Sequence, residues 1–295
     1  MTDKLKLPNE VKIAHVHLQV SNLERALTFY SGLLGLHEVK REGDTAFLSA
    51  TGEPPYHIIL TEIEDAVPQV RQNAGLFHVA IRFPSRAALA NALLNLVENN
   101  WPLQGASDHL VSEAIYLPDP DGLGIELYWD RPRDTWKMVN EGIEMATLPL
   151  DLQDLIEQAD QRNGSYAIDP KTDIGHVHLQ VSDIEKAERF YHKSLGLDVM
   201  TRSYPGALFM AAGGYHHHLG ANTWNSRGGE PAPANAVGLR SYAYQFPDET
   251  SWQAAQDRLE TNGYEVEGRK GYGYKESVLV RDEDRIGVEL LVSKE

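Results

Sequence analysis

The sequence contains no cysteine and has few positive charges for its length. Without cysteine the chain cannot form disulfides, thiolate nucleophiles or cysteine-ligated metal sites. Lysine and arginine together number 27 against 43 aspartates and glutamates, so the net charge is −16. This charge predicts that no nucleic acid binds, because phosphates would be repelled. No apolar run could span a bilayer, and the N-terminus has no hydrophobic signal region, so we expect a cytoplasmic protein without a membrane partner.

Two segments of the chain repeat each other. Residues 13–36 read IAHVHLQVSNLERALTFYSGLLGL, and residues 174–197 read IGHVHLQVSDIEKAERFYHKSLGL. A match of this length at a fixed offset indicates two homologous halves. The 295 residues suffice for two domains that each bury a core. The repeated segment opens with a histidine pair in each half, His15 with His17 and His176 with His178.

Each half divides again into two units with the order strand, helix and three strands. Residues 15–20 alternate between polar and apolar side chains, which predicts a half-buried strand. Ser21 or Asn22 can cap the following helix, and Gly35 can end it. Three strand-like runs complete the first unit, at 36–41, 45–50 and 57–62.

The same order recurs in the rest of the chain. The second unit has a strand at 77–83, a helix capped by Ser85 that runs to Glu98, and strands near Leu103, at 113–117 and at 124–128. Two further units cover about 173–224 and 237–293. The predicted fold class is therefore α+β, with four βαβββ units paired into two incompletely closed, barrel-like domains. We place the first pair at 10–131, a linker with one helix at 132–172, and the second pair at 173–293.

Two histidines and a glutamate could share the hollow of the first pair. His15 opens the first strand of unit one, His78 opens that of unit two, and Glu126 lies on the last strand of unit two. Paired units bury their uncovered sheet faces against each other and leave a concavity. Two imidazoles and one carboxylate on rigid strands form a facial set of ligands, which suits Fe(II) or Mn(II) and leaves positions open for substrate and O₂.

At this point the sequence resembles a known family. The four units and the motifs I-x-H-V-x-L-x-V, F-H-V-A and D-P-D-G-x-G-I-E-L-Y are similar to those of the vicinal-oxygen-chelate superfamily. Within it, the chain resembles type I extradiol dioxygenases of the catechol 2,3-dioxygenase kind. The resemblance implies an enzyme that uses Fe(II), possibly Mn(II), to cleave a small catechol-type aromatic with O₂. Glyoxalase I and antibiotic-binding resistance proteins share the fold and remain alternatives.

Three further residues are implied by the resemblance as catalytic. Tyr116 stands ten residues before Glu126, where the family has a tyrosine, and His109 resembles an upstream family histidine. His57 loosely matches a third family histidine at the start of a last strand. Ring cleavage needs a base for the catechol hydroxyl, a proton donor and a donor to the substrate oxygen, and these side chains could supply them.

The second half carries a broken copy of the ligand set. His176 matches His15 and Glu289 matches Glu126, but Ser241 stands where His78 would be. A neutral hydroxyl is a weak ligand, so we expect this half to be degenerate. A histidine cluster on its first unit leaves a rival site open, made of His176, His216 or His218, and Glu289.

Two other functions stay open from the sequence. A glyoxalase-type or isomerase-type metalloenzyme would prefer four protein ligands, and Glu62 could be the fourth. A metal-free protein that sequesters an aromatic compound would use the cavity without the ligands. The chain could also form a homo-oligomer.

Overall fold

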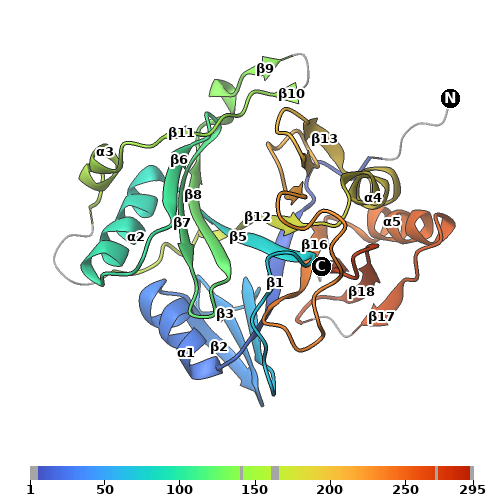
Figure 1. Ribbon diagram of the computed structural model, residues 1–295, viewed down its shortest axis with the longest axis horizontal. Helices are drawn as coiled ribbons and strands as arrows, with labels where there is room; N and C mark the ends of the chain where they lie inside the picture. The colour runs from blue at the N-terminus through green and yellow to red at the C-terminus, as the bar shows by residue number, and fades with distance from the viewer. Residues whose placement is uncertain (1–5, 140–141, 161–165, 270–271, 293–295) are drawn as a thin grey trace.

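The computed structural model describes residues 6–139, 142–160, 166–269 and 272–292 and contains all four predicted units (Figure 1). Residue 293, the last of the predicted second pair, lies outside them. The first unit comprises β1 (Lys12–Val20), α1 (Leu23–Leu27), the π-helical η1 (Thr28–Leu33), β2 (His37–Glu42), β3 (Thr45–Ser49) and β4 (Ile58–Glu62). The second comprises β5 (Gly75–Phe83), α2 (Arg86–Glu98), β6 (Gly105–Asp108), β7 (Ser112–Pro118) and β8 (Gly124–Asp130).

The other two units follow a short connecting segment. That segment holds η2 (Arg133–Thr135), β9 (Met138–Val139), β10 (Gly142–Ile143), β11 (Leu148–Pro149) and α3 (Leu152–Glu157). The third unit comprises β12 (Asp173–Gln180), α4 (Ile184–Ala187), the π-helical η3 (Glu188–Leu195), β13 (Asp198–Thr201), β14 (Ala207–Ala211) and β15 (Leu219–Asn222). The fourth comprises β16 (Gly238–Phe246), α5 (Glu249–Thr261), β17 (Glu267–Arg269), β18 (Glu276–Arg281) and β19 (Gly287–Val292).

Local signals in the sequence set the ends of the helices. The Asn22 side chain accepts a hydrogen bond from the Arg25 amide, and Ser85 accepts one from the Ala88 amide, so both are N-caps. Gly35 follows η1 with a φ of 81°, a left-handed conformation that glycine adopts without strain. The predicted linker helix is present as α3. Of the helices in the described part of the chain, none combines the length and apolar character that a membrane crossing requires.

The units pair across the two halves of the chain, which corrects the pairing that we expected within each half. One sheet has the order β17-β18-β19-β16-β1-β4-β3-β2 and so joins the first unit to the fourth. The other has the order β11-β6-β7-β8-β5-β12-β15-β14-β13 and joins the second unit to the third. The four first strands, β1, β5, β12 and β16, cross at the centre of the molecule (Figure 1). The fold class is confirmed, but each curved sheet draws one unit from each half.

The two sheets have the same internal register. In the first, β1 pairs antiparallel with β16, and β16 pairs parallel with β19. In the second, β12 pairs antiparallel with β5, and β5 pairs parallel with β8. Helices α2 and α5 bury one face each, through side chains such as Leu89, Leu93 and Leu259. The opposite face of each sheet is not covered by these helices.

Candidate active site

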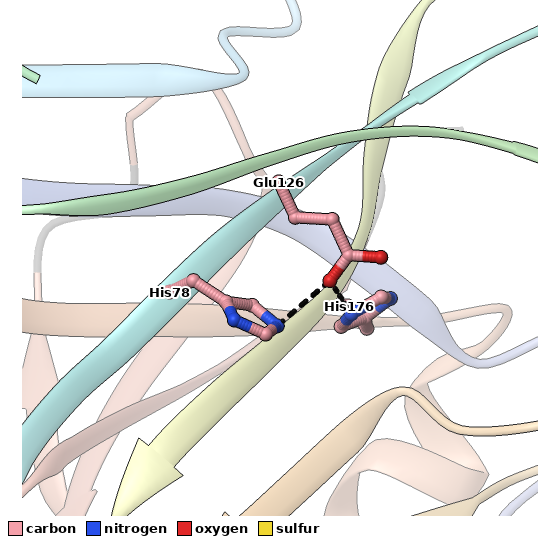
Figure 2. Close-up of side chains that lie close together, drawn as sticks. All are labelled: His78, Glu126 and His176. Atoms are coloured by element: carbon pink, nitrogen blue, oxygen red, sulfur yellow. Dashed lines mark hydrogen bonds and ion pairs between the residues drawn. The ribbon is translucent and has the colours of Figure 1, made fainter. Parts of the chain in front are cut away.

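Three ionisable side chains meet on the concave face of the second sheet (Figure 2). His78 comes from β5, Glu126 from β8 and His176 from β12. Ala80 on β5 lies opposite His176 on β12 and opposite Glu126 on β8, so these two residues flank the same position of β5. The Nε2 atoms of His78 and His176 lie 2.9 Å and 3.2 Å from Glu126 Oε2. Two imidazoles and a carboxylate thus converge on one point.

The triad is buried, and its charges depend on one another. The exposed fractions of His78, Glu126 and His176 are 6%, 2% and 1%. Burial alone would raise the pKa of Glu126, but the imidazoles of His176 and His78 hold it well below its usual range. Burial lowers the pKa of His176 to about 4. A carboxylate beside a neutral imidazole is the protonation state that a divalent cation requires.

The hydrogen bonding of the triad is incomplete in the way that a metal site requires. His78 Nε2 is buried and lacks a hydrogen-bond partner among the described residues, although Glu126 Oε2 is only 2.9 Å away. A buried imidazole nitrogen that faces a carboxylate without a well-formed hydrogen bond can bind a cation placed between the two. The ligand atoms of the three residues all lie within 4.8 Å of one another. This donor set fits Fe(II) or Mn(II) and leaves several coordination positions open.

The structure replaces one member of the predicted ligand set. His78 and Glu126 come together as expected, but His15 does not join them, because β1 belongs to the other sheet. There the Nε2 of His15 lies 3.7 Å from Glu289 Oε2. His176, the repeat equivalent of His15, takes its place beside His78. The structure thus brings a histidine of the same motif and the same kind of strand to this place, but from the other half of the chain.

A cavity of about 210 Å³ opens in front of the triad. Aromatic side chains form much of its wall, and hydroxyl groups and imidazoles form the rest. The lining residues are Phe77, His78, Ser107, His109, Ser112, Tyr116, Glu126, Met145, Thr147, His178, Tyr204, Phe209, His217 and Trp224. An apolar, aromatic wall with a few polar groups near a metal site suits a small planar ligand.

Two of the three predicted catalytic residues, His109 and Tyr116, line this cavity as a hydrogen-bonded pair. Their Nε2 and hydroxyl oxygen lie 2.6 Å apart, and His109 Nδ1 lies 2.7 Å from the Ala146 carbonyl oxygen. A carbonyl can only accept, so Nδ1 carries the proton in a neutral ring and Tyr116 donates to Nε2. Tyr116 also pairs with Glu126 across β7 and β8. Burial, with Glu126 close by, raises the pKa of Tyr116 well above its usual value, so the phenol stays protonated.

A third acid–base group, His217, was not predicted. Its ring lines the cavity and packs against the His176 ring at a centroid distance of 4.0 Å. Behind it, His216 Nε2 lies 2.8 Å from Asp130 Oδ1, and the Nδ1 atoms of His216 and His217 lie 2.7 Å apart. Since Asp130 accepts, His216 donates from Nε2, and a neutral His216 ring accepts at Nδ1. His217 then donates from Nδ1, which leaves the lone pair of its Nε2 free. The unusual run of three histidines was the signal in the sequence.

The remaining predicted site residues lie away from the cavity. His57 precedes β4 in the first sheet, where its Nδ1 accepts from the Ala50 amide, so it does not contact the triad. His218 does the same with the Ala212 amide in the second sheet. Glu62 lies on β4 in the first sheet, where it accepts from the Leu23 amide, so it does not join the triad as a fourth ligand. The rival set of His176, His216 or His218, and Glu289 does not assemble, because Glu289 belongs to the first sheet.

Comparisons with known proteins agree with this geometry. The family model described as the Glyoxalase/Bleomycin resistance protein/Dioxygenase superfamily matches residues 12–127 and 173–290. A catechol-2,3-dioxygenase from Bacillus subtilis is 41% identical over 262 residues, which cover 88% of this chain and 90% of that protein. A manganese-dependent 2,3-dihydroxybiphenyl 1,2-dioxygenase from Geobacillus genomosp. 3 is 23% identical over 92% of this chain and 81% of its own.

A solved structure supports the fold. Glyoxalase I from Zea mays superposes with a TM-score of 0.59 at 17% identity, over 96% of this chain and 92% of its own. At that identity the likeness concerns the arrangement of the chain only. The family match covers most of both halves, and it includes all three residues of the triad. The chain therefore belongs to the Glyoxalase/Bleomycin resistance protein/Dioxygenase superfamily.

Proposed function

We propose that this protein is an extradiol dioxygenase that cleaves the ring of a catechol-type aromatic with O₂. The observation that carries the proposal is the buried group of His78, Glu126 and His176 at the wall of an aromatic-lined cavity. The 41% identity to a catechol-2,3-dioxygenase over most of both chains supports the same reaction. The substrates would be a small catechol and O₂.

The three side chains would hold one Fe(II), or alternatively Mn(II), which the manganese-dependent relative uses. Bound there, such an ion supplies neighbouring coordination positions for the catechol oxygens and O₂. The protein holds the ligands on three hydrogen-bonded strands, so the face is fixed before substrate arrives. That a homo-oligomer forms and that the protein works in the cytoplasm stay predictions from the sequence.

The cavity residues would bind the ring and move protons. Phe77, Phe209 and Trp224 supply aromatic faces against which a catechol ring can pack. The free Nε2 of His217 can accept a proton from a catechol hydroxyl on one side of the cavity. On the other side Tyr116 can donate its single hydroxyl proton to a substrate oxygen instead of to His109 Nε2, which is then free to accept a proton.

The proposal is tested by anaerobic loading with Fe(II), addition of catechol under nitrogen, and then admission of air. We expect bound iron, a spectral change on adding catechol, and a yellow ring-fission product only after air enters. Glu126→Gln is the matched control, since an amide of the same shape is a poorer ligand than a carboxylate. Iron binding and catechol binding without any product in air would refute the dioxygenase. A Glu126→Gln variant with full iron content would refute the ligand assignment.

A further inference from the structure

The first sheet repeats the geometry of the metal ligands position by position. Across β1 and β16, His15 lies opposite Ala243, and Ala243 lies opposite Glu289 on β19. In the second sheet His176 and Glu126 flank Ala80 in the same way. His15 and Glu289 therefore occupy the places that two of the metal ligands occupy in the active site.

The third ligand position of this copy holds a serine. Ser241 lies opposite His17, as His78 lies opposite His178. Its hydroxyl donates to Glu289 Oε1 at 2.6 Å. The copy therefore keeps one imidazole and one carboxylate, and a hydroxyl stands in place of the second imidazole.

The retained ligands are buried, and three of their polar atoms lack hydrogen-bond partners. Both ring nitrogens of His15 and the Oε2 of Glu289 lack hydrogen bonds among the described residues, and each side chain has an exposed fraction of 0%. The 3.7 Å between His15 Nε2 and Glu289 Oε2 is too long for a hydrogen bond. Unsatisfied groups of this kind destabilise a fold, so their arrangement calls for a compensating charge.

Arg269 supplies that charge. On β17 it lies opposite Ser277, while Ser107 on β6 lies opposite Ala114. Leu279, two residues after Ser277, lies opposite Glu289, and Tyr116, two residues after Ala114, lies opposite Glu126. Arg269 therefore occupies the place of Ser107, which lines the active-site cavity. Its Nη1 lies 3.1 Å from Glu289 Oε1. A guanidinium thus stands beside the carboxylate where the other sheet would hold a metal ion.

A tyrosine ring fills the space in front of this group. The ring of Tyr272 lies 5.1 Å from that of Phe47 and 6.1 Å from those of His15 and His17. The register of β3 and β4 against β1 makes Phe47 the equivalent of Phe209, and His17 that of His178. In the second sheet those two equivalents are walls of the substrate cavity.

We propose that the first sheet carries a latent metal site plugged by the chain's own side chains, with Arg269 in the place of the cation and Tyr272 in the place of the aromatic ring. The plug accounts for the serine at position 241, because Arg269 already neutralises Glu289. The site takes a divalent cation only when the guanidinium is removed and the missing imidazole is restored. This inference concerns the first sheet alone and does not depend on the reaction proposed for the second.

The test restores the ligand set and counts bound ions. With Mn(II) as the probe, wild-type protein should bind one ion per chain, and the Ser241→His/Arg269→Ser variant should bind two. Adding Glu289→Gln should return the count to one, because it removes a ligand of the new site only. The matched control is Ser241→His alone, which keeps the guanidinium and should still bind one ion. Equilibrium dialysis with metal analysis, and the paramagnetic resonance of bound Mn(II), give the counts.

Two results of that titration would overturn the proposal. One is a folded Ser241→His/Arg269→Ser protein whose count does not rise. The other is a wild-type protein with an ion that Glu289→Gln removes, since the first sheet would then already hold metal. A wild-type protein without any ion would instead count against the function proposed for the second sheet.

Thermal unfolding tests whether Arg269 neutralises Glu289, even if the Ser241→His/Arg269→Ser variant does not fold. Arg269→Met should lower the Tm by roughly 5 °C or more, because it leaves a buried carboxylate unpaired. Adding Glu289→Gln to Arg269→Met should recover most of the loss, since no charge then needs a partner. Losses that simply add in the double variant would show that Arg269 does not neutralise Glu289.

The role of Tyr272 is tested by removing its side chain and adding a free molecule of the same shape. Tyr272→Ala should open a cavity that p-cresol, the side chain of tyrosine as a free molecule, can fill. Saturating p-cresol should then raise the Tm of Tyr272→Ala by about 1 °C or more beyond its effect on wild-type protein. Equal shifts in the two proteins would mean that the ring does not occupy a ligand-sized space.

Discussion

The rings of His78 and His176 lie 5.6 Å apart, centroid to centroid, although they belong to different halves of the chain. The pairing of β5 with β12 brings them together, and Glu126 on β8 lies close to both. A metal bound here would tie the two halves to each other. Metal affinity should therefore report the long-range pairing of strands as well as the ligands.

The two histidines related by the repeat should behave differently. His176→Ala removes a proposed metal ligand and should abolish most metal binding, because only His78 and Glu126 remain. His15→Ala changes the equivalent position of the first sheet and should leave the metal content unchanged. Metal analysis of the two purified variants checks this. The reverse pattern would place the metal in the first sheet.

Tyr116→Phe should separate binding from turnover. It removes the hydroxyl that lies 2.6 Å from His109 Nε2 and keeps the ring in place. We expect unchanged metal content and catechol affinity, with kcat lower by roughly 10²-fold, the usual scale for one acid–base or oxyanion contact. Anaerobic catechol titration and steady-state kinetics measure the two effects. Unchanged kcat would remove Tyr116 from the reaction.

His217→Gln should also lower kcat, because it removes the Nε2 lone pair at the cavity end of the hydrogen-bonded series Asp130–His216–His217. A fall of roughly 10²-fold is expected for the loss of a general base. Metal content must be measured alongside, since the His217 ring packs against that of His176. His57→Gln is the matched control from the first sheet, and we expect it to leave kcat unchanged. Equal effects of the two substitutions would contradict the assignment of His217.

Stability should depend on pH through Asp282. Its carboxyl accepts from the Tyr191 hydroxyl and from the amides of Asp284 and Ile286, yet burial raises its pKa from 3.8 to about 7. Because the folded state holds this proton more tightly than the unfolded state, its contribution is complete below pH 3.8 and is lost as the pH rises through 7. The pKa difference corresponds to about 4 kcal/mol of unfolding free energy.

Urea unfolding at pH 4.5 and 7.5 checks this pH dependence. The unfolding free energy of wild-type protein should fall relative to that of Asp282→Asn between the two values, since the asparagine cannot titrate. A constant difference between the two proteins across this range would show that Asp282 is charged in the folded state throughout.

Local patterns were enough to predict the elements and the residue types that meet at the candidate site. Alternation at 15–20 marked a strand, Ser85 marked the start of α2, and the repeat showed that both halves carry the same motifs. His78 and Glu126 were identified because first and last strands of a unit face its hollow. These features depend on residues close together in the chain, where side-chain chemistry acts directly on backbone conformation.

The sequence by itself thus determined the βαβββ unit, its fourfold repetition and the residue types that meet at the candidate site. Only the tertiary structure decided which units share a sheet, and so whether His15 or His176 completes the triad. The physical reason is that the first strands of the four units pair through backbone hydrogen bonds, and backbone groups are the same in every strand. The repeats present nearly identical edges, so the path of the whole chain selects the partner. The plug of the first sheet has the same origin, since Arg269 and Glu289 meet only once β17 and β19 are in place.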